Sequence, residues 1–172
     1  MKEQKSIDIE KRDKAIEIPK NIFNSIVEEV RKELLKEPKV SENRNDYYGL
    51  CGTAADLTAK KICQYLKEKF EPNSIKDAYL NLKVYYLKIF NRSHHIITWG
   101  ENLHNSWKID PTIDQFKKLF PLPKDRFIFS PKEQYPLPID EQKEIDISTD
   151  VISRVYLDNN LSLIHISEPT RP

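Results

Sequence analysis

The chain has 172 residues, with 28 Lys and Arg side chains against 27 Asp and Glu, and a formal net charge of +1. This length suits one domain, and the balanced charge argues against a nucleic-acid binder driven by bulk charge. Hydrophobic residues make up 38% and charged residues 32%, so we expect a soluble domain with a small core and a charged surface. No apolar run approaches the roughly 18 residues of a membrane span.

The N-terminal segment and the cysteines bear on the compartment. The N-terminal sequence MKEQKSIDIEKRDK is polar and has no apolar signal core. Two cysteines, Cys51 and Cys63, are too few for a disulfide scaffold. The cytoplasm is therefore the default location, and secretion without a signal stays open.

The first expected helix follows a charged arm. Residues 1–18 lack a sustained period and are interpreted as a mobile arm. Pro19 opens a helix over residues 20–37, and Pro38 ends it before a polar connection at 39–48. The residues expected on its inner face recur at helical spacing: Ile22, Phe23, Ile26, Val27, Val30, Leu34 and Leu35.

A second helix is expected from Cys51 to Phe70, and its first residue is the main candidate for chemistry. The chain has three glycines, and two of them, Gly49 and Gly52, flank Cys51. At a helix start the dipole and the free N–H groups favour a thiolate and can stabilise an oxyanion. We expect Ala54, Ala55, Ile62 and Leu66 on the inner face of this helix.

The plainer interpretation of Cys51 is a small buried residue at a helix start, because cysteine is often buried. The flanking glycines and the partners described below favour a nucleophile instead. Cys63 lies 12 residues further on, about 18 Å along a continuous helix. A disulfide between the two is then impossible, and Cys63 is expected to pack in the core.

Strands are expected after the helices. Residues 79–90 are rich in aromatic and β-branched types, and 94–99 and 103–110 complete an antiparallel set that turns at Gly100. A short helix is expected over 112–119. Helices first and antiparallel strands afterwards indicate an α+β fold.

The C-terminal third offers fewer signals. Residues 121–147 are rich in proline and are expected to wrap over the core, and 148–160 are a possible helix. The string LSLIHISEPTR at 161–171 resembles the translation of a transposon-end sequencing adapter; the alternative is a natural amphipathic tail. We therefore expect one domain over 19–160, cut short, with a non-native tail at 161–172, and leave His165 out of the chemistry.

A thiolate catalyst needs a base, and the base needs an orienting acceptor. The chain supplies His94 and His95 in one expected strand and Asp110 at the end of the next. Alternation puts only one of the two histidines on the cleft side. We favour His95, because Ile97 and Trp99 share its face and would pack against the helix of Cys51; His94 is the alternative base.

This order of Cys, His and Asp resembles the papain-like superfamily, and more closely its transglutaminase-like branch, over residues 45–120. The matching segments are GLCGTAA around Cys51, HHIITW with His94 and His95, and WKIDPT with Asp110. The resemblance implies a helix N-terminus packed on a small antiparallel sheet. It also implies a nucleophile at Cys51, a general base at His95 or His94, and an orienting carboxylate at Asp110.

The resemblance further implies a thiol-dependent hydrolase or acyltransferase that acts on amide bonds through an acyl-enzyme. Its oxyanion donors would be the backbone N–H of Cys51 and the side chain of Asn45, six residues earlier. Gln115 and Phe116, which follow the D-P-T string, are assigned to packing and supporting hydrogen bonds. No metal or organic cofactor is implied, and the expected partner is a protein or peptide substrate, with no nucleic acid and no membrane.

Three other functions compete with this interpretation. A cysteine phosphatase is excluded because no Arg follows Cys51 in CGTAADL. A zinc site could use Cys51, His94, His95 and His104, but the chain has no C-x-x-C pair or helical His pair of the usual spacing. The serious rival is a catalytically inactive binding module of the same fold.

Overall fold

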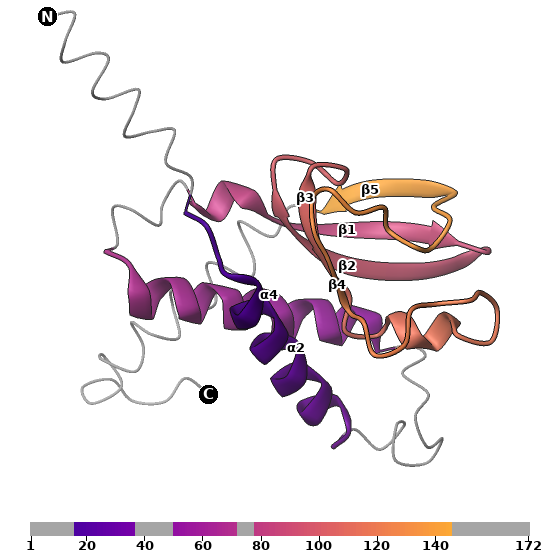
Figure 1. Ribbon diagram of the computed structural model, residues 1–172, viewed down its shortest axis with the longest axis horizontal. Helices are drawn as coiled ribbons and strands as arrows, with labels where there is room; N and C mark the ends of the chain where they lie inside the picture. The colour runs from indigo at the N-terminus through magenta and orange to yellow at the C-terminus, as the bar shows by residue number, and fades with distance from the viewer. Residues whose placement is uncertain (1–15, 37–49, 72–77, 146–172) are drawn as a thin grey trace, which may run out of the picture.

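The computed structural model describes residues 16–36, 50–71 and 78–145, and shows an α+β arrangement of two helices beside a five-stranded antiparallel sheet (Figure 1). The α+β class expected from the order of the elements is confirmed. The strand order in the sheet is β4-β3-β2-β1-β5. The elements are α2 (Lys20–Leu34), α4 (Cys51–Lys69), the 3-10 helix η1 (Tyr79–Asn81), β1 (Leu82–Ile89), β2 (Arg92–Gly100), β3 (Ser106–Ile109), the 3-10 helix η2 (Ile113–Phe116), β4 (Ile128–Phe129) and β5 (Glu141–Ile145).

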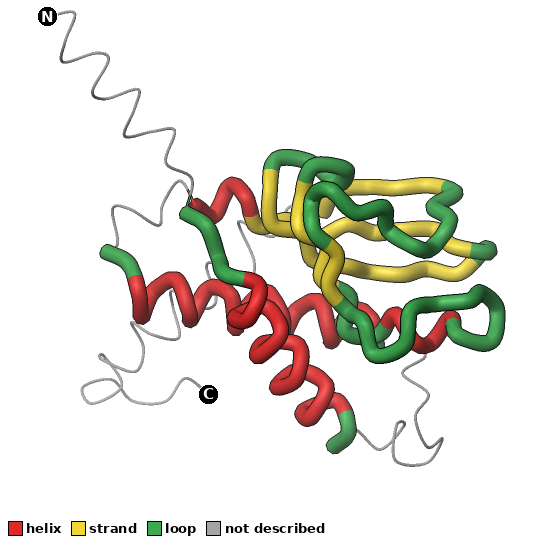
Figure 2. Tube along the Cα trace, in the orientation of Figure 1, coloured by secondary structure: helices red, strands yellow, loops and turns green. Residues whose placement is uncertain are grey.

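Both helices lie on one face of the sheet, as the tube in Figure 2 shows. The apolar stripe of α2 is buried at Phe23, Ile26, Val27, Val30 and Leu34, whereas Leu35 is half exposed just after the helix ends. The inner face expected for α4 is also buried, and Cys63 is fully buried in the same core with a free thiol. We call this cluster the helix-side core.

The opposite face of the sheet is covered by the chain that follows β3. Tyr85, Leu87 and Ile96 project from β1 and β2 on this side, because alternate residues of a strand face opposite ways. They pack against side chains from the expected wrap and from η2: Phe116, Phe129, Tyr135 and Leu137. This second cluster is the wrap-side core, and it encloses most of the polar groups of the site.

A hairpin joins β2 to β3 and brings the histidines toward Asp110. Gly100 pairs with Ser106, and Ile97 pairs with Ile109. Gly100 has a φ of 151°, and a Cβ there would lie 2.8 Å from the Ser106 Cα. The sequence expectation of a turn at Gly100 is confirmed, and the backbone explains the choice of glycine.

Several elements differ from their expected form. Ile18, which the sequence analysis placed in the arm, is buried in the helix-side core. The helix expected over 112–119 is the four-residue η2, and the wrap contains β4 and β5, which were not anticipated because their sequences carry no clear alternation. The remaining expectations lie outside the described residues: the arm up to residue 15, the 39–48 connection, the 148–160 helix and the 161–172 tail.

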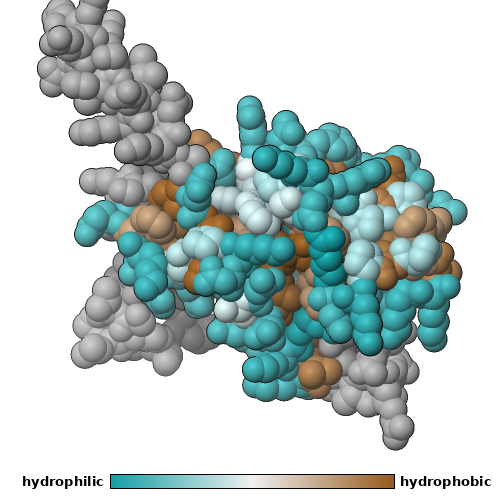
Figure 3. Space-filling view, viewed as in Figure 1, coloured by the Kyte–Doolittle hydropathy of each residue, from teal (hydrophilic) through white to brown (hydrophobic). Residues whose placement is uncertain are grey.

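The surface is largely hydrophilic over the face drawn in Figure 3, as the high charged fraction suggested. β5 is exposed along its whole length, and its charged residues protect that sheet edge from pairing with another chain. Within the described ranges, neither α2 nor α4 has the length and apolarity that crossing a membrane requires.

Replacing Gly100 should destabilise the hairpin that positions Asp110. We expect Gly100→Ala to lower the free energy of unfolding by about 1–3 kcal/mol, because an alanine there is strained and meets Ser106 and the carbonyl oxygen of Asn105. Gly52→Ala is the matched control, since a Cβ at Gly52 meets nothing within 4 Å and Gly52 lies inside α4. That substitution should leave stability unchanged or raise it by about 0.5–1 kcal/mol. Urea titration of both variants checks this, and equal stabilities would contradict it.

Candidate active site

Cys51 is the first residue of α4, and its sulfur lies against β2. The Cys51 Sγ is 3.5 Å from His95 Nδ1 and 3.9 Å from the carbonyl oxygen of Ser93. Cys51 is buried, with 8% of its surface exposed. The helix start therefore delivers the thiol to the strand that carries both histidines.

The thiol sits beside an edge of β2 and not over one face of the sheet. The register with β3 covers Ile97–Gly100, so Ser93 and His95 lie beyond it on the same strand. The carbonyl of Ser93 and the backbone N–H of His95 both interact with the sulfur. Since Cys51 is close to the plane of the sheet at this edge, side chains from both faces of β2 reach it.

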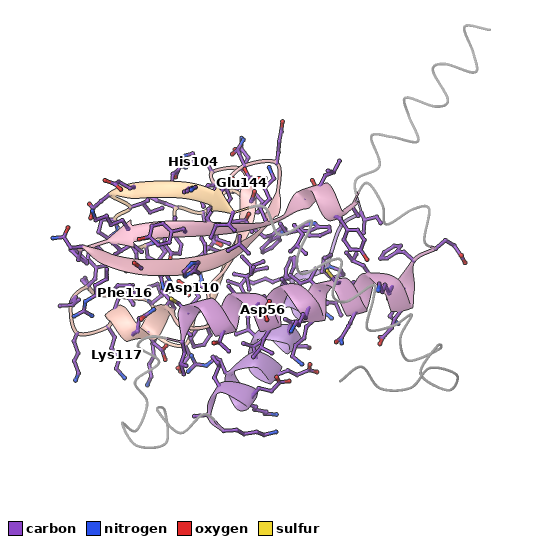
Figure 4. All side chains as sticks on the ribbon, turned by 180° about the vertical axis from the view of Figure 1, so that it is seen from behind. Asp56, His104, Asp110, Phe116, Lys117 and Glu144 are labelled. Carbon is purple, nitrogen blue, oxygen red and sulfur yellow. The ribbon has the colours of Figure 1, made fainter. Side chains whose placement is uncertain are left out.

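His94 is bonded to Asp110 on the wrap side of the sheet. Its Nε2 lies 2.8 Å from Asp110 Oδ2, and both side chains are fully buried. The register places Asp110 just after Ile109, which pairs with Ile97, so the histidine and the carboxylate lie diagonally across neighbouring strands. Figure 4 shows Asp110 and Phe116 at the end of the molecule where α4 begins.

Asp110 has further donors that fix its carboxylate. The hydroxyl of Tyr135 donates to Oδ2 at 2.5 Å, and the backbone N–H of Thr112 donates to Oδ1 at 3.3 Å. The backbone N–H of Asp110 itself donates to the carbonyl of Phe127. A buried carboxylate is tolerated only when its oxygens are satisfied in this way.

The His94 ring has a second polar contact and an aromatic neighbour. Gln115 Nε2 lies 2.8 Å from His94 Nδ1, and the Phe116 ring stands edge-on to the imidazole at a centroid distance of 5.0 Å. His95, on the other face, stands edge-on to Tyr86. The two imidazoles therefore have different surroundings, and Asp110 orients His94.

Helix α2 anchors the segment that carries Gln115. The guanidinium of Arg31 makes a two-pronged ion pair with Asp114 at 3.2 and 3.0 Å and donates to the carbonyl of Pro111 at 2.7 Å. It also lies 4.1 Å from the centroid of the Phe127 ring. A planar guanidinium suits this bidentate geometry, so α2 fixes η2 against the sheet.

The surroundings of Cys51 make it acidic. Burial alone would raise the pKa of the thiol, but hydrogen bonds from His94 and His95 and the charge of His94 outweigh it, and lower the pKa from 9.0 to about 6. For Cys63, burial raises the pKa to about 12. Only the first of these thiols is a thiolate near neutral pH.

His94 is shifted in the complementary direction. Burial would lower its pKa, but the charge of Asp110, the hydrogen bond to Asp110 and the interaction with Cys51 raise the pKa from 6.5 to about 9. A thiolate and an imidazolium thus coexist between about pH 6 and pH 9. Such a pair is the resting state expected of a cysteine nucleophile.

The structure brings together the residues singled out in the sequence but separates the roles of the two histidines. His95 does share the helix side of the sheet with Ile97 and Trp99, as expected. Asp110 lies on the other side, where it contacts His94. The preference for His95 rested on packing alone, and packing carried no information about where the carboxylate would lie.

Other expected contributors are placed differently. Asn45 and Gly49 lie outside the described residues, so the proposed Asn45 oxyanion contact stays a prediction. His104 lies on the exposed turn between β2 and β3. Among residues 16–36, 50–71 and 78–145, no group of three or more His, Cys, Asp or Glu side chains is arranged to hold a metal ion.

Tyr135, which bonds to Asp110 from the wrap, was not expected from the sequence. Its neighbours in the sequence, EQYPLP, carry no signal for a buried phenol. Gln115 was assigned to packing and supporting hydrogen bonds, and the structure shows such a bond with His94.

Comparisons of the chain with protein-family models, curated proteins and solved structures gave no match.

Alkylation by iodoacetamide should separate the two cysteines. We expect the Cys51 rate to rise with pH through a midpoint near 6, because the thiol loses its proton there, and Cys63 to react only after unfolding. Peptide mass spectrometry gives both rates. His94→Gln should move the Cys51 midpoint upward toward 9.0, since the lowering interactions of His94 are lost. An unchanged midpoint would show that His94 does not act on the thiol.

Proposed function

We propose that the protein is a thiol-dependent hydrolase or acyltransferase that acts on amide bonds of a protein or peptide through an acyl-enzyme. Cys51 is the nucleophile, His94 is the general base and acid, and Asp110 orients the imidazole. The observation that carries this proposal is a thiol at a helix start that two imidazoles make acidic, one of them bonded to a buried carboxylate.

The reaction follows from where the protons lie. The Cys51 thiolate attacks the carbonyl carbon of the amide, a C–S bond forms, and the carbonyl oxygen becomes an oxyanion. The C–N bond then breaks, and the His94 imidazolium gives its proton to the leaving amine. Water or a second amine attacks the resulting thioester and loses a proton to His94, and the C–S bond breaks to return the thiolate.

Asp110 favours His94 as the base. A carboxylate that accepts from Nε2–H holds the ring in one tautomer and stabilises the imidazolium, so in this proposal Nδ1 is the nitrogen that exchanges a proton with the thiol. His95 contributes differently: its side chain and its backbone N–H lower the pKa of the thiol, without a carboxylate behind it in the described contacts. We assign His95 to stabilising the thiolate.

The oxyanion donors in this proposal are the backbone N–H of Cys51 and the side chain of Asn45. The first N–H groups of an α-helix have no acceptor within the helix, so the start of α4 is suited to a developing negative charge. The two-layer arrangement of helix and antiparallel sheet supports the finer proposal of a papain-like or transglutaminase-like fold. No metal or organic cofactor takes part in the proposed steps.

The function is tested by incubating the protein with a proteome-derived peptide library and with a primary amine. New N-termini indicate a protease, released ammonia indicates a deamidase, and amine incorporation indicates a transglutaminase. Cys51→Ala should remove whichever product forms, because no thioester can form without the sulfur. The protein is a binding module if none of the three products forms and the pH midpoint of Cys51 alkylation lies near 9, the ordinary pKa of a thiol.

The assignment of His94 has its own test. With p-nitrophenyl acetate as an activated acyl donor, His94→Gln should lower the acylation rate of Cys51 at pH 7 by about 10²–10⁴-fold, because His94 no longer keeps the thiol ionised and no longer exchanges its proton. His95→Gln should lower the acylation rate by less than about tenfold, since His94 is retained. The release of p-nitrophenolate and the mass of the acetylated protein give the rates. A larger loss for His95→Gln would reverse the assignment.

Asp110→Asn tests whether the carboxylate stabilises the charged form of His94 as well as orienting its ring. The amide can no longer stabilise the imidazolium, so the pKa of His94 falls and the window in which thiolate and imidazolium coexist narrows from its alkaline side. We expect an acylation rate lowered by roughly 10²–10⁴-fold at pH 8. Circular dichroism controls for folding, because Asp110 is fully buried. A wild-type rate in a folded variant would contradict the role of Asp110.

A further inference from the structure

The side chain of Gln115 is bonded to the nitrogen of His94 that the mechanism needs. Gln115 Nε2 lies 2.8 Å from His94 Nδ1. An amide nitrogen only donates, so in this arrangement Nδ1 accepts and carries no proton, and the ring proton is on Nε2 facing Asp110. Nδ1 is then the ring nitrogen without a proton, and its single lone pair must leave the Gln115 amide when it takes the proton of Cys51.

This contact must change once His94 is charged. An imidazolium donates from both nitrogens, so Nδ1–H and the Gln115 amide N–H would be two donors facing each other. Half a turn of the amide group presents Oε1 to Nδ1 and restores the hydrogen bond. An amide, like a hydroxyl, can serve both states of the ring at one position, because it can donate and accept.

A neighbouring hydroxyl fits either orientation of the amide. Thr112 Oγ1 lies 3.5 Å from Gln115 Nε2, and Thr112 is fully buried. A hydroxyl can accept from Nε2 or donate to Oε1. The backbone around Gln115 is meanwhile held by the Arg31–Asp114 ion pair, and Gln115 itself is only half-buried. The amide can therefore turn while its segment stays in place.

We propose that Gln115 is a positioning residue whose amide serves both protonation states of His94, donating from Nε2 to Nδ1 of the neutral ring and accepting through Oε1 from Nδ1–H of the imidazolium. This inference rests on the proposed function, and adds that the ring is held at both nitrogens before and after the proton transfer. Without Gln115 the imidazole keeps Asp110 but loses its second anchor.

The groups that face His94 allow its titration to be followed. They are Cys51 from α4, Asp110 after β3 and, through Asp110, Tyr135 from the wrap; His95 projects to the other face. Burial and Asp110 hold the pKa of Tyr135 well above its usual value. The Cys51 alkylation rate should therefore rise near pH 6 and again near pH 9, when the thiolate loses its imidazolium. His94→Gln should remove the second step.

Two substitutions test whether the amide works in both directions. In Gln115→Met each protonation state of the ring loses one hydrogen bond, so the alkylation step near pH 9 should stay within about half a pH unit of its wild-type position. Acylation by p-nitrophenyl acetate should fall about tenfold or more, because the ring is less well held. In Gln115→Glu the carboxylate accepts but does not donate when ionised, so the second step should move up by about one pH unit or more. Gln64→Glu, on an exposed position of α4, should change neither.

Three outcomes would overturn the inference. A second step that moves up by about a unit in Gln115→Met would mean that Gln115 only donates, and one that moves down would mean that it only accepts. A wild-type acylation rate in Gln115→Met would leave Gln115 a packing role alone. These results are distinguishable from a failure of the proposed function, which fails instead if wild-type protein forms no Cys51-dependent product from any amide substrate.

Discussion

The buried hydrogen bond between His94 and Asp110 is the interaction on which the rest of the site depends. Both side chains are fully buried, and neither could be tolerated there without the other, since an unpaired buried charge is strongly destabilising. Tyr135 and the backbone N–H of Thr112 donate further hydrogen bonds to the Asp110 carboxylate, so it stays an acceptor for the ring. Hydrogen bonds from His94 and His95, together with the charge of His94, lower the pKa of Cys51 in spite of its burial.

Each part of the fold contributes one component of this arrangement. Helix α4 brings the sulfur to the edge of β2, the β2–β3 hairpin sets the diagonal between His94 and Asp110, and the wrap supplies Tyr135. Helix α2 acts from a distance, because Arg31 ties Asp114 and Pro111 to it and so fixes the segment of Gln115. The site is therefore assembled by packing on both faces of one sheet.

The two histidines are consecutive residues of one strand, and yet both act on the same thiol. On a sheet face only one of two consecutive residues could reach a given thiol. Cys51 instead contacts the carbonyl of Ser93 and the side chain of His95 beyond the register of β3, and both His94 and His95 lower its pKa. Two imidazoles offset the burial of the thiol, and only the one with a carboxylate behind it gains a fixed tautomer. Adjacent histidines at such an edge can thus divide the base from the stabiliser of the thiolate.

The sequence by itself determined the α+β class, the buried faces of α2 and α4, the turn at Gly100 and the selection of Cys51, His94, His95 and Asp110, because periodicity and residue chemistry are local properties. Only the tertiary structure decided which imidazole meets the carboxylate, since that depends on the register between β2 and β3 and on where β3 ends. It alone also revealed Tyr135 and the place of Gln115, because a buried phenol and an amide acquire their partners from segments distant in sequence.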